Sequence, residues 1–263
     1  MSASSGQVAP LARRAFAAIA TPYFTRMSAG ARDADLAAVR SDVSASLRLI
    51  GMLIAGAFAA LAAAALPFAA VFSNAPDEVV SIGIVLLAFL IGLVPFSVLF
   101  VLQRTFYALG DTRTPFLIQL VQSALFVVGA LVVAAVAPGP VVAAGIALVT
   151  SAAGIVQALV AALVLRHRLG GVGGGRLARS FGVYLLATAP AAAAGVGILF
   201  LLGGLPGDGG GFAVSELVPA VVSVILIGAV TFGVYLGALA LARVSEVREI
   251  GALVRRLTGR GTG

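Results

Sequence analysis

The sequence contains no cysteine, no tryptophan and no lysine, and it contains a single histidine. Without cysteine the chain can form no disulfide, no thiolate nucleophile and no zinc–thiolate site. Charged residues make up only 10% of the 263 residues, against roughly a quarter in an ordinary soluble domain. Because general bases and metal ligands are so scarce, the sequence predicts no enzyme, no metal site and no cofactor.

Apolar residues are abundant instead. They make up 61% of the chain, and the mean hydropathy is +1.13. Uncharged stretches recur that are long enough to cross about 30 Å of hydrocarbon. We expect an all-α polytopic transmembrane bundle, because helices satisfy their own backbone hydrogen bonds in lipid and no stretch alternates as a barrel strand does. The sequence predicts six spans, at residues 48–72, 79–103, 114–136, 141–165, 180–203 and 217–242.

The basic residues all fall on one side of this arrangement. All seventeen are arginines, and they precede the first span, follow the sixth, or lie between the second and third or the fourth and fifth. The opposite loops carry only acidic residues, namely Asp77, Glu78, Asp208 and Glu216. The positive-inside rule then places both termini in the cytoplasm. The net charge of +7 follows from this topology, so we expect anionic membrane lipid as a partner and no nucleic acid.

The predicted spans divide the chain into six segments. Leu36, Val39, Val43 and Leu47 repeat at helical spacing, which predicts an interfacial helix over residues 32–47 before the first span. The segments are a divergent polar N-terminus (1–14), the end of a truncated helix plus the interfacial helix (15–47), four spans (48–165), an Arg/Gly-rich cytoplasmic loop (166–179), two further spans (180–243) and a basic cytoplasmic tail (244–263).

Four prolines lie inside or near the ends of the predicted spans: Pro67, Pro95, Pro190 and Pro219. A proline inside a helix leaves the carbonyl four residues earlier without its donor and kinks the helix. Transporters use such breaks, but ordinary membrane helices also carry proline.

The interiors of the predicted spans hold no ionisable residue, so these six helices do not by themselves form a complete ion-coupled pump. Gln119, Gln122 and Ser123 lie at positions i, i+3 and i+4 and share one helix face. Two uses are open: hydrogen bonds between helices, or a polar wall that faces a water-filled cavity. These three residues are the candidate cavity-facing positions.

The densest local pattern covers residues 104–115. Tyr107 suits the headgroup level, and the glycine before Asp111 is typical of a turn. The Thr–Pro pair that closes the pattern suits the first turn of the next helix. Arg104 and Arg113 flank Asp111 and can pair with it or with lipid phosphate.

This loop resembles the MurJ/MviN family of lipid II flippases, within the multidrug/oligosaccharidyl-lipid/polysaccharide exporter superfamily. Between its tenth and eleventh helices the family carries an arginine, an aromatic–Tyr–Ala element and an Asp–Thr–x–Thr–Pro element. The matching residues are Arg104, Phe106, Tyr107, Ala108, Asp111, Thr112, Thr114 and Pro115. Residues 20–26 are similar to the end of the family's eighth helix, and the spacing from Leu47 to Phe72 resembles its ninth.

The resemblance implies that the six spans correspond to helices nine to fourteen, with the first seven helices and most of the eighth missing. It implies a flippase, or a fragment of one, that carries lipid II across the bacterial cytoplasmic membrane by alternating access between two lobes. The cargo is a polyprenyl-pyrophosphate-linked saccharide, and the last two spans border a groove for its tail. The family's cavity charges lie mainly in the missing part, and residues 123–127 lack the asparagine of its eleventh helix.

Two alternatives remain open from the residues. The first is a flippase of the same superfamily that exports another polyprenyl-linked polysaccharide. The second is a non-transporting membrane scaffold that binds a partner through its arginine-rich face. Lipid II retention in the inner leaflet, loss of a different polymer, or a normal envelope with a co-purifying partner distinguishes the three hypotheses.

Overall fold

The computed structural model describes residues 35–171, 173–204 and 211–247. Over these residues the secondary structure is helical, and six helical stretches are long and apolar enough to cross a membrane. The prediction of an all-α bundle with six spans is therefore confirmed. The truncated helix, the match at residues 20–26 and most of the basic tail lie outside the described residues.

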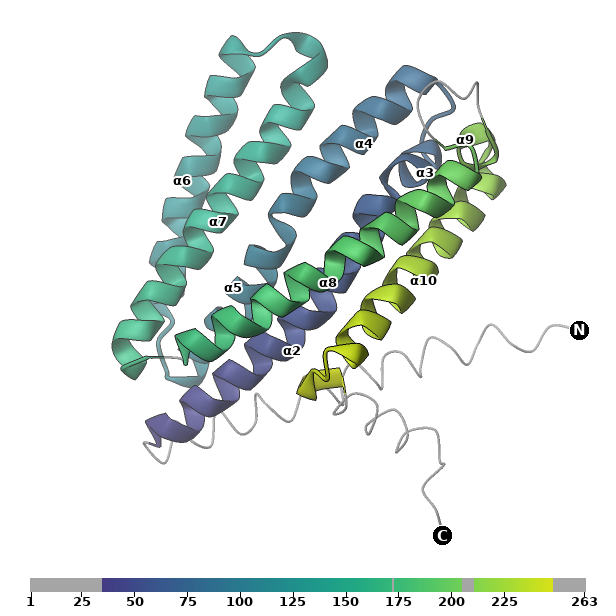
Figure 1. The fold of residues 1–263 in the computed structure, drawn as a ribbon. Coiled ribbons are helices and arrows are strands. Elements are labelled where there is room, and N and C mark those ends of the chain that lie inside the picture. Colours follow the sequence, from purple (N-terminus) through teal and green to yellow (C-terminus); the bar gives the residue numbers. More distant parts are fainter. Residues whose placement is uncertain (1–34, 172, 205–210, 248–263) are drawn as a thin grey trace, which may run out of the picture.

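The helices form two groups that meet along α2 and α5 (Figure 1). In one group α2, α8 and α10 pack against one another, and in the other α7 packs against α4, α5 and α6. The elements are α2 (Leu36–Ala63), α3 (Ala65–Ala70), α4 (Pro76–Ile91), α5 (Leu93–Ala108), α6 (Arg113–Val136), the 3₁₀ turn η1 (Gly139–Val141), α7 (Val142–Leu169), α8 (Gly174–Leu201), α9 (Phe212–Ser215) and α10 (Leu217–Leu241).

Three of the four prolines fix where helices end. In each case the preceding helix ends at the residue four positions before the proline. Proline has no N–H, so it cannot donate a hydrogen bond to the carbonyl of that residue. The pairs are Pro67 with Ala63, Pro95 with Ile91, and Pro219 with Ser215. Pro190 is the exception, since α8 continues through it.

The break between α4 and α5 is completed by a side chain from α7. The Gly92 N–H donates to the carbonyl of Phe89 at 3.0 Å, rather than to the Ala88 carbonyl four residues back, as an α-helix requires. The Ser151 hydroxyl donates to that Ala88 carbonyl at 2.7 Å. A Cβ at position 92 would lie 2.9 Å from the Ser151 Oγ, so the close approach of the two helices requires glycine here.

The interfacial helix expected over residues 32–47 is not a separate element. Instead α2 runs without interruption through the described part of that segment and on into the first span. Val39, Val43 and Leu47 do share one face, but they are buried against α5 and α7 instead of facing a lipid surface. The hydropathy pattern predicts where a helix leaves the hydrocarbon of the membrane. The helix itself can continue beyond that point, as α2 does.

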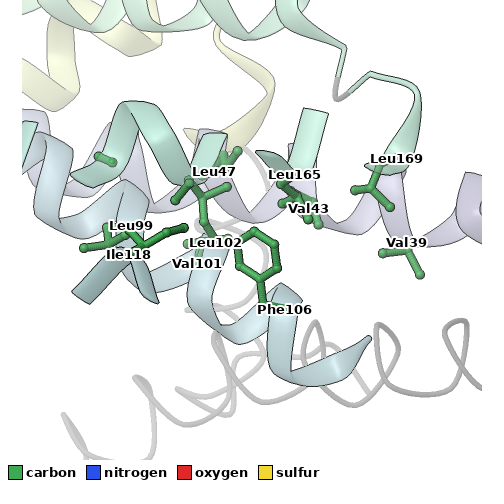
Figure 2. Packing of buried hydrophobic residues seen from close by; sticks show 12 residues of the cluster. Val39, Val43, Leu47, Leu99, Val101, Leu102, Phe106, Ile118, Leu165 and Leu169 are labelled. Carbon is green, nitrogen blue, oxygen red and sulfur yellow. The ribbon is translucent and has the colours of Figure 1, made fainter. Parts of the chain in front are cut away.

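The largest cluster of buried residues joins α2, α5, α6 and α7 (Figure 2). Phe106 is fully buried in it, close to the end of α5. Its members are Val39, Val43, Leu47, Leu99, Val101, Leu102, Phe106, Ile118, Ala158, Ala161, Leu165 and Leu169. The cluster fixes the ends of α5 and α7 and thereby positions the loop that follows α5.

Charge separates along the bundle axis in the part of the chain that the structure describes. We define the basic end by the helix ends that carry Arg40, Arg104, Arg113, Arg166, Arg168, Arg176, Arg179 and Arg243, together with Arg48 in the first half of α2. The acidic end, where α3, α4 and α9 meet (Figure 1), carries Asp77, Glu78 and Glu216. The described chain starts and stops at the basic end. The arrangement therefore matches the single-sided arginines predicted from the sequence.

Candidate functional site

The loop after α5 begins with a turn that requires glycine. Gly110 has a φ of 74°, a backbone conformation that residues other than glycine rarely adopt. Its N–H donates to the Tyr107 carbonyl at 3.0 Å, and the Asp111 N–H donates to the Phe106 carbonyl at 2.9 Å. This pair of bonds is the Schellman arrangement that ends a helix. It directs the Asp111 side chain toward the start of α6.

Asp111 connects the loop to two helices. One carboxylate oxygen accepts hydrogen bonds from the backbone N–H groups of Arg113 and Thr114, each at 3.0 Å, and so caps α6. The other oxygen lies 2.5 Å from a guanidinium nitrogen of Arg168, in the last turn of α7. The carboxylate thereby joins the beginning of one helix to the end of another.

Arg168 of α7 is a partner of this loop that the sequence pattern did not indicate. Besides Asp111 it donates to the Thr114 hydroxyl at 3.0 Å, and its guanidinium carbon lies 5.8 Å from the centre of the Phe106 ring. The sequence pointed to Arg104 and Arg113 as ion partners because they flank the aspartate. The structure instead pairs Asp111 with Arg168, and Arg104 lies over the Phe100 ring at 5.1 Å.

These contacts keep the Asp111 carboxylate ionised. Hydrogen bonds from the side chain and backbone of Thr114 are the largest influence on its pKa, and they outweigh an opposing effect of burial. The nearby Arg168 charge and the Arg113 N–H lower the pKa further, and together they bring it from 3.8 to about 2. The loop thus retains its cap and its ion pair at any pH that a cell meets.

We expect Asp111→Asn to lower the thermal stability and the accumulation of the protein. Because the folded pKa lies below the unfolded one, the aspartate stabilises the fold fully above about pH 4, and this contribution is lost as the pH falls toward about 2. The difference in Tm between wild type and Asp111→Asn in detergent should therefore narrow over that interval. Asp42→Asn on α2 is the control, and a gap that stays constant with pH would contradict the assignment.

The other residues of the motif divide into buried and exposed positions. Phe106 and Pro115 are buried, whereas Tyr107 and Thr112 are exposed, with 52% of Tyr107 accessible. The aromatic pair therefore performs two tasks, since Phe106 packs the core and Tyr107 faces outward. The Asp111 carboxylate of the loop is thus held by α6 and α7, whereas Tyr107 and Thr112 face outward.

The three candidate polar residues of α6 lie together, and α7 adds a fourth. The Gln157 amide nitrogen donates to the Gln119 amide oxygen at 2.9 Å, and the Gln119 nitrogen donates to the Gln122 oxygen at 2.8 Å. Gln157 is 4% exposed, whereas Gln119 and Ser123 are exposed. We call Gln119, Gln122, Ser123 and Gln157 the amide row. One edge of it joins α6 to α7, and the other lies on the surface of the described bundle.

The amide row lies within the candidate membrane spans Arg113–Val136 and Gly139–Leu169. Gln119 is six residues into α6, which places it about 9 Å along the helix from its first residue. Among the helices α6 packs chiefly against α7, and only 6% of its most apolar stretch is buried. A polar edge on such a helix needs cover by protein or water rather than lipid.

A sequence profile described as "Lipid II flippase MurJ" matches residues 16–209. The chain belongs to the MurJ family. Among solved structures the chain is similar to "Lipid II flippase MurJ, inward closed conformation", with a TM-score of 0.55 and 16% sequence identity. At this level of sequence identity, the similarity shows a shared fold only. It covers 81% of this chain and 41% of the MurJ chain, and no curated protein matches.

Membership of the MurJ family confirms the resemblance found in the motif loop, which lies within the matched residues. MurJ proteins are membrane transporters and not enzymes, and this chain is accordingly an integral membrane protein with six candidate spans. The chain spans 41% of the length of the MurJ structure that it resembles.

Proposed function

We propose that this chain forms part of a flippase that moves lipid II across the bacterial cytoplasmic membrane by alternating access. The observation that carries the proposal is the MurJ profile match over residues 16–209, together with the six-helix fold that it shares with the MurJ structure. A sugar–pyrophosphate head cannot cross hydrocarbon unaided and needs a polar cavity, whereas a polyprenyl tail is soluble in lipid. In this proposal α8 and α10 border the path of the tail.

The proposal also assigns the membrane orientation. The basic end faces the cytoplasm, since arginines near membrane spans are retained on that side. Anionic headgroups of the inner leaflet then surround the exposed arginines at the start of α8, Arg176 and Arg179. The motif loop 104–115 lies at the same end and connects two spans as a fixed unit.

Depletion of the gene tests the cargo. We expect lipid II to accumulate in the inner leaflet while its synthesis continues, measured by its access to an externally added enzyme that cleaves it. Unchanged lipid II with loss of another surface polymer would instead support export of a different polyprenyl-linked saccharide. A normal envelope together with a stable co-purifying partner would support a scaffold.

Within the flippase we propose that the outer edge of the amide row faces the water-filled cavity. Because the chain has no cysteine, a single introduced thiol can report its own surroundings. We expect Ser123→Cys to react with a membrane-impermeant thiol reagent at least about tenfold faster than a thiol facing lipid, because a thiol in hydrocarbon stays protonated.

The matched control for this labelling is Val121→Cys. Val121 is 53% exposed and lies two residues before Ser123, on about the opposite side of the helix. Equal and slow labelling at the two positions would assign the amide row to contacts between helices alone. Equal and fast labelling would mean that α6 is surrounded by water, which is incompatible with a membrane span.

A further inference from the structure

The chain turns back on the bundle immediately after α10. Arg243 has a φ of 55°, a left-handed conformation that no other non-glycine residue shows within the described ranges. Its N–H donates to the Ala240 carbonyl at 3.0 Å, and the Val244 N–H donates to the Leu239 carbonyl at 3.1 Å. An arginine adopts this conformation at a cost, which contacts beyond the turn must offset.

Those contacts lie on α2, α8 and α10. Val244 and Val247 pack against a buried cluster that contains residues of three helices. Its members are Leu49, Met52 and Ala55 of α2, Tyr184, Ala187 and Ala191 of α8, and Tyr235 and Leu239 of α10. We call residues 244–247 the clasp.

An ion pair between distant parts of the chain closes the clasp. Glu246 Oε1 lies 2.6 Å from Arg48 Nε, and the two side chains are 7% and 18% exposed. Arg48 also donates to the Ser44 hydroxyl at 2.9 Å, and the Ser245 hydroxyl donates to the second Glu246 oxygen at 2.8 Å. Burial alone raises the pKa of Glu246, but hydrogen bonds from Ser245, its own backbone and Arg48, with the Arg48 charge, bring the net pKa below its usual value.

We infer that the clasp is a conformational lock on the basic end of the α2–α8–α10 group, and that the Arg48–Glu246 pair is its fastening. The other packing contacts of the clasp come from two valines, which can shift over an apolar surface at little cost. The buried ion pair cannot separate partially, because that would leave a buried charge without its partner. The clasp therefore opens as a unit. While it is closed, α10 cannot part from α2 at this end. The inference does not depend on which lipid-linked cargo the protein carries.

Hydrogen exchange on the full chain in lipid nanodiscs tests the lock. We expect the amides of residues 243–247 to exchange at least about tenfold faster in Glu246→Gln and in Arg48→Gln than in wild type, because loss of one charge favours the open clasp. Exchange across α6 and α7 should stay unchanged, which shows that each variant is folded. The reversed pair, Arg48→Glu with Glu246→Arg, should restore most of the protection.

Tyr235→Phe is the matched control. Its hydroxyl donates to the Met52 carbonyl at 2.8 Å, so this variant removes a second bond between α10 and α2 while leaving the ion pair intact. Protection of the clasp in Tyr235→Phe should equal that of wild type. Wild-type exchange in Glu246→Gln would overturn the inference. So would accelerated exchange that the reversed pair fails to restore, because packing and not charge would then hold the segment.

Spin labels measure the motion itself. Cysteines introduced at the exposed positions Ser41 on α2 and Leu241 at the end of α10 are the only thiols in the chain. We expect one narrow distance distribution in the otherwise wild-type chain and a broader, longer one when Glu246→Gln is added. An unchanged distribution would mean that α10 stays against α2 without the ion pair, which would also overturn the lock.

Discussion

Replacement of Phe106 by alanine is expected to lower the free energy of unfolding by about 3–5 kcal/mol, the range for a buried phenylalanine. The ring is fully buried where α2, α5 and α7 meet, and the Arg168 guanidinium lies over it at 5.8 Å. Its removal leaves a cavity in the core and takes away one of the contacts that hold Arg168 near Asp111. Unfolding in detergent, followed by circular dichroism against denaturant, measures the loss.

Tyr107→Ala is the matched control because the two aromatic residues are adjacent and belong to the same motif. Tyr107 is 52% exposed, so its truncation should change the unfolding free energy by less than about 1 kcal/mol. Similar losses for the two variants would mean that Tyr107 has a packing partner that the described bundle does not provide. A small loss for Phe106→Ala would contradict the assignment of that ring to the core.

Gly195→Ala is expected to lower the free energy of unfolding by about 1–3 kcal/mol, the range for inserting an extra methyl group into a packed core. Gly195 lies where α8 crosses α2 and α10. A Cβ there would overlap the Thr231 hydroxyl and lie 2.6 Å from the Ala63 Cβ. The contacts are side chains on two different helices, so at least one helix must move to admit the methyl group.

Gly197→Ala is the control on the same helix, since a Cβ there would meet nothing within 4 Å. It should be neutral or slightly stabilising, because alanine favours the helix by up to about 1 kcal/mol over glycine. Adding Thr231→Ala to Gly195→Ala should recover part of the loss, since it removes the nearest obstacle. Equal effects of the two glycine variants would show that helix propensity and not packing governs this position.

Local chemistry predicted the spans and the loop well. The uncharged runs identified all six spans. The prolines predict kinks in the spans, whereas in the structure a helix ends four residues before three of them, because the proline has no N–H for that carbonyl. The turn before Asp111 follows in the same way from Gly110. These features depend on residues a few positions apart, so a single sequence suffices to find them.

The partners across the bundle could not be found in this way. Arg168 contacts Asp111, and Arg48 contacts Glu246, which lies 198 positions later in the sequence. Nothing in the spacing of the charges distinguishes these arginines from the others at the basic end. The positive-inside rule alone accounts for all of these arginines. The sequence therefore does not distinguish Arg48 and Arg168, which also form buried or capping contacts, from the others.

The interruption between α4 and α5 has a mechanical consequence. On one side of the interruption, α5 packs in the cluster around Phe106. On the other side, the Ser151 hydroxyl of α7 donates a hydrogen bond to the Ala88 carbonyl of α4. Both halves of this crossing are therefore tied to α7, so a tilt of the α6–α7 hairpin would pull on α5 as well as on α4. Such a displacement would reach the motif loop at one end, through Arg168 and the start of α6, and Asp77 and Glu78 at the far tip of α4.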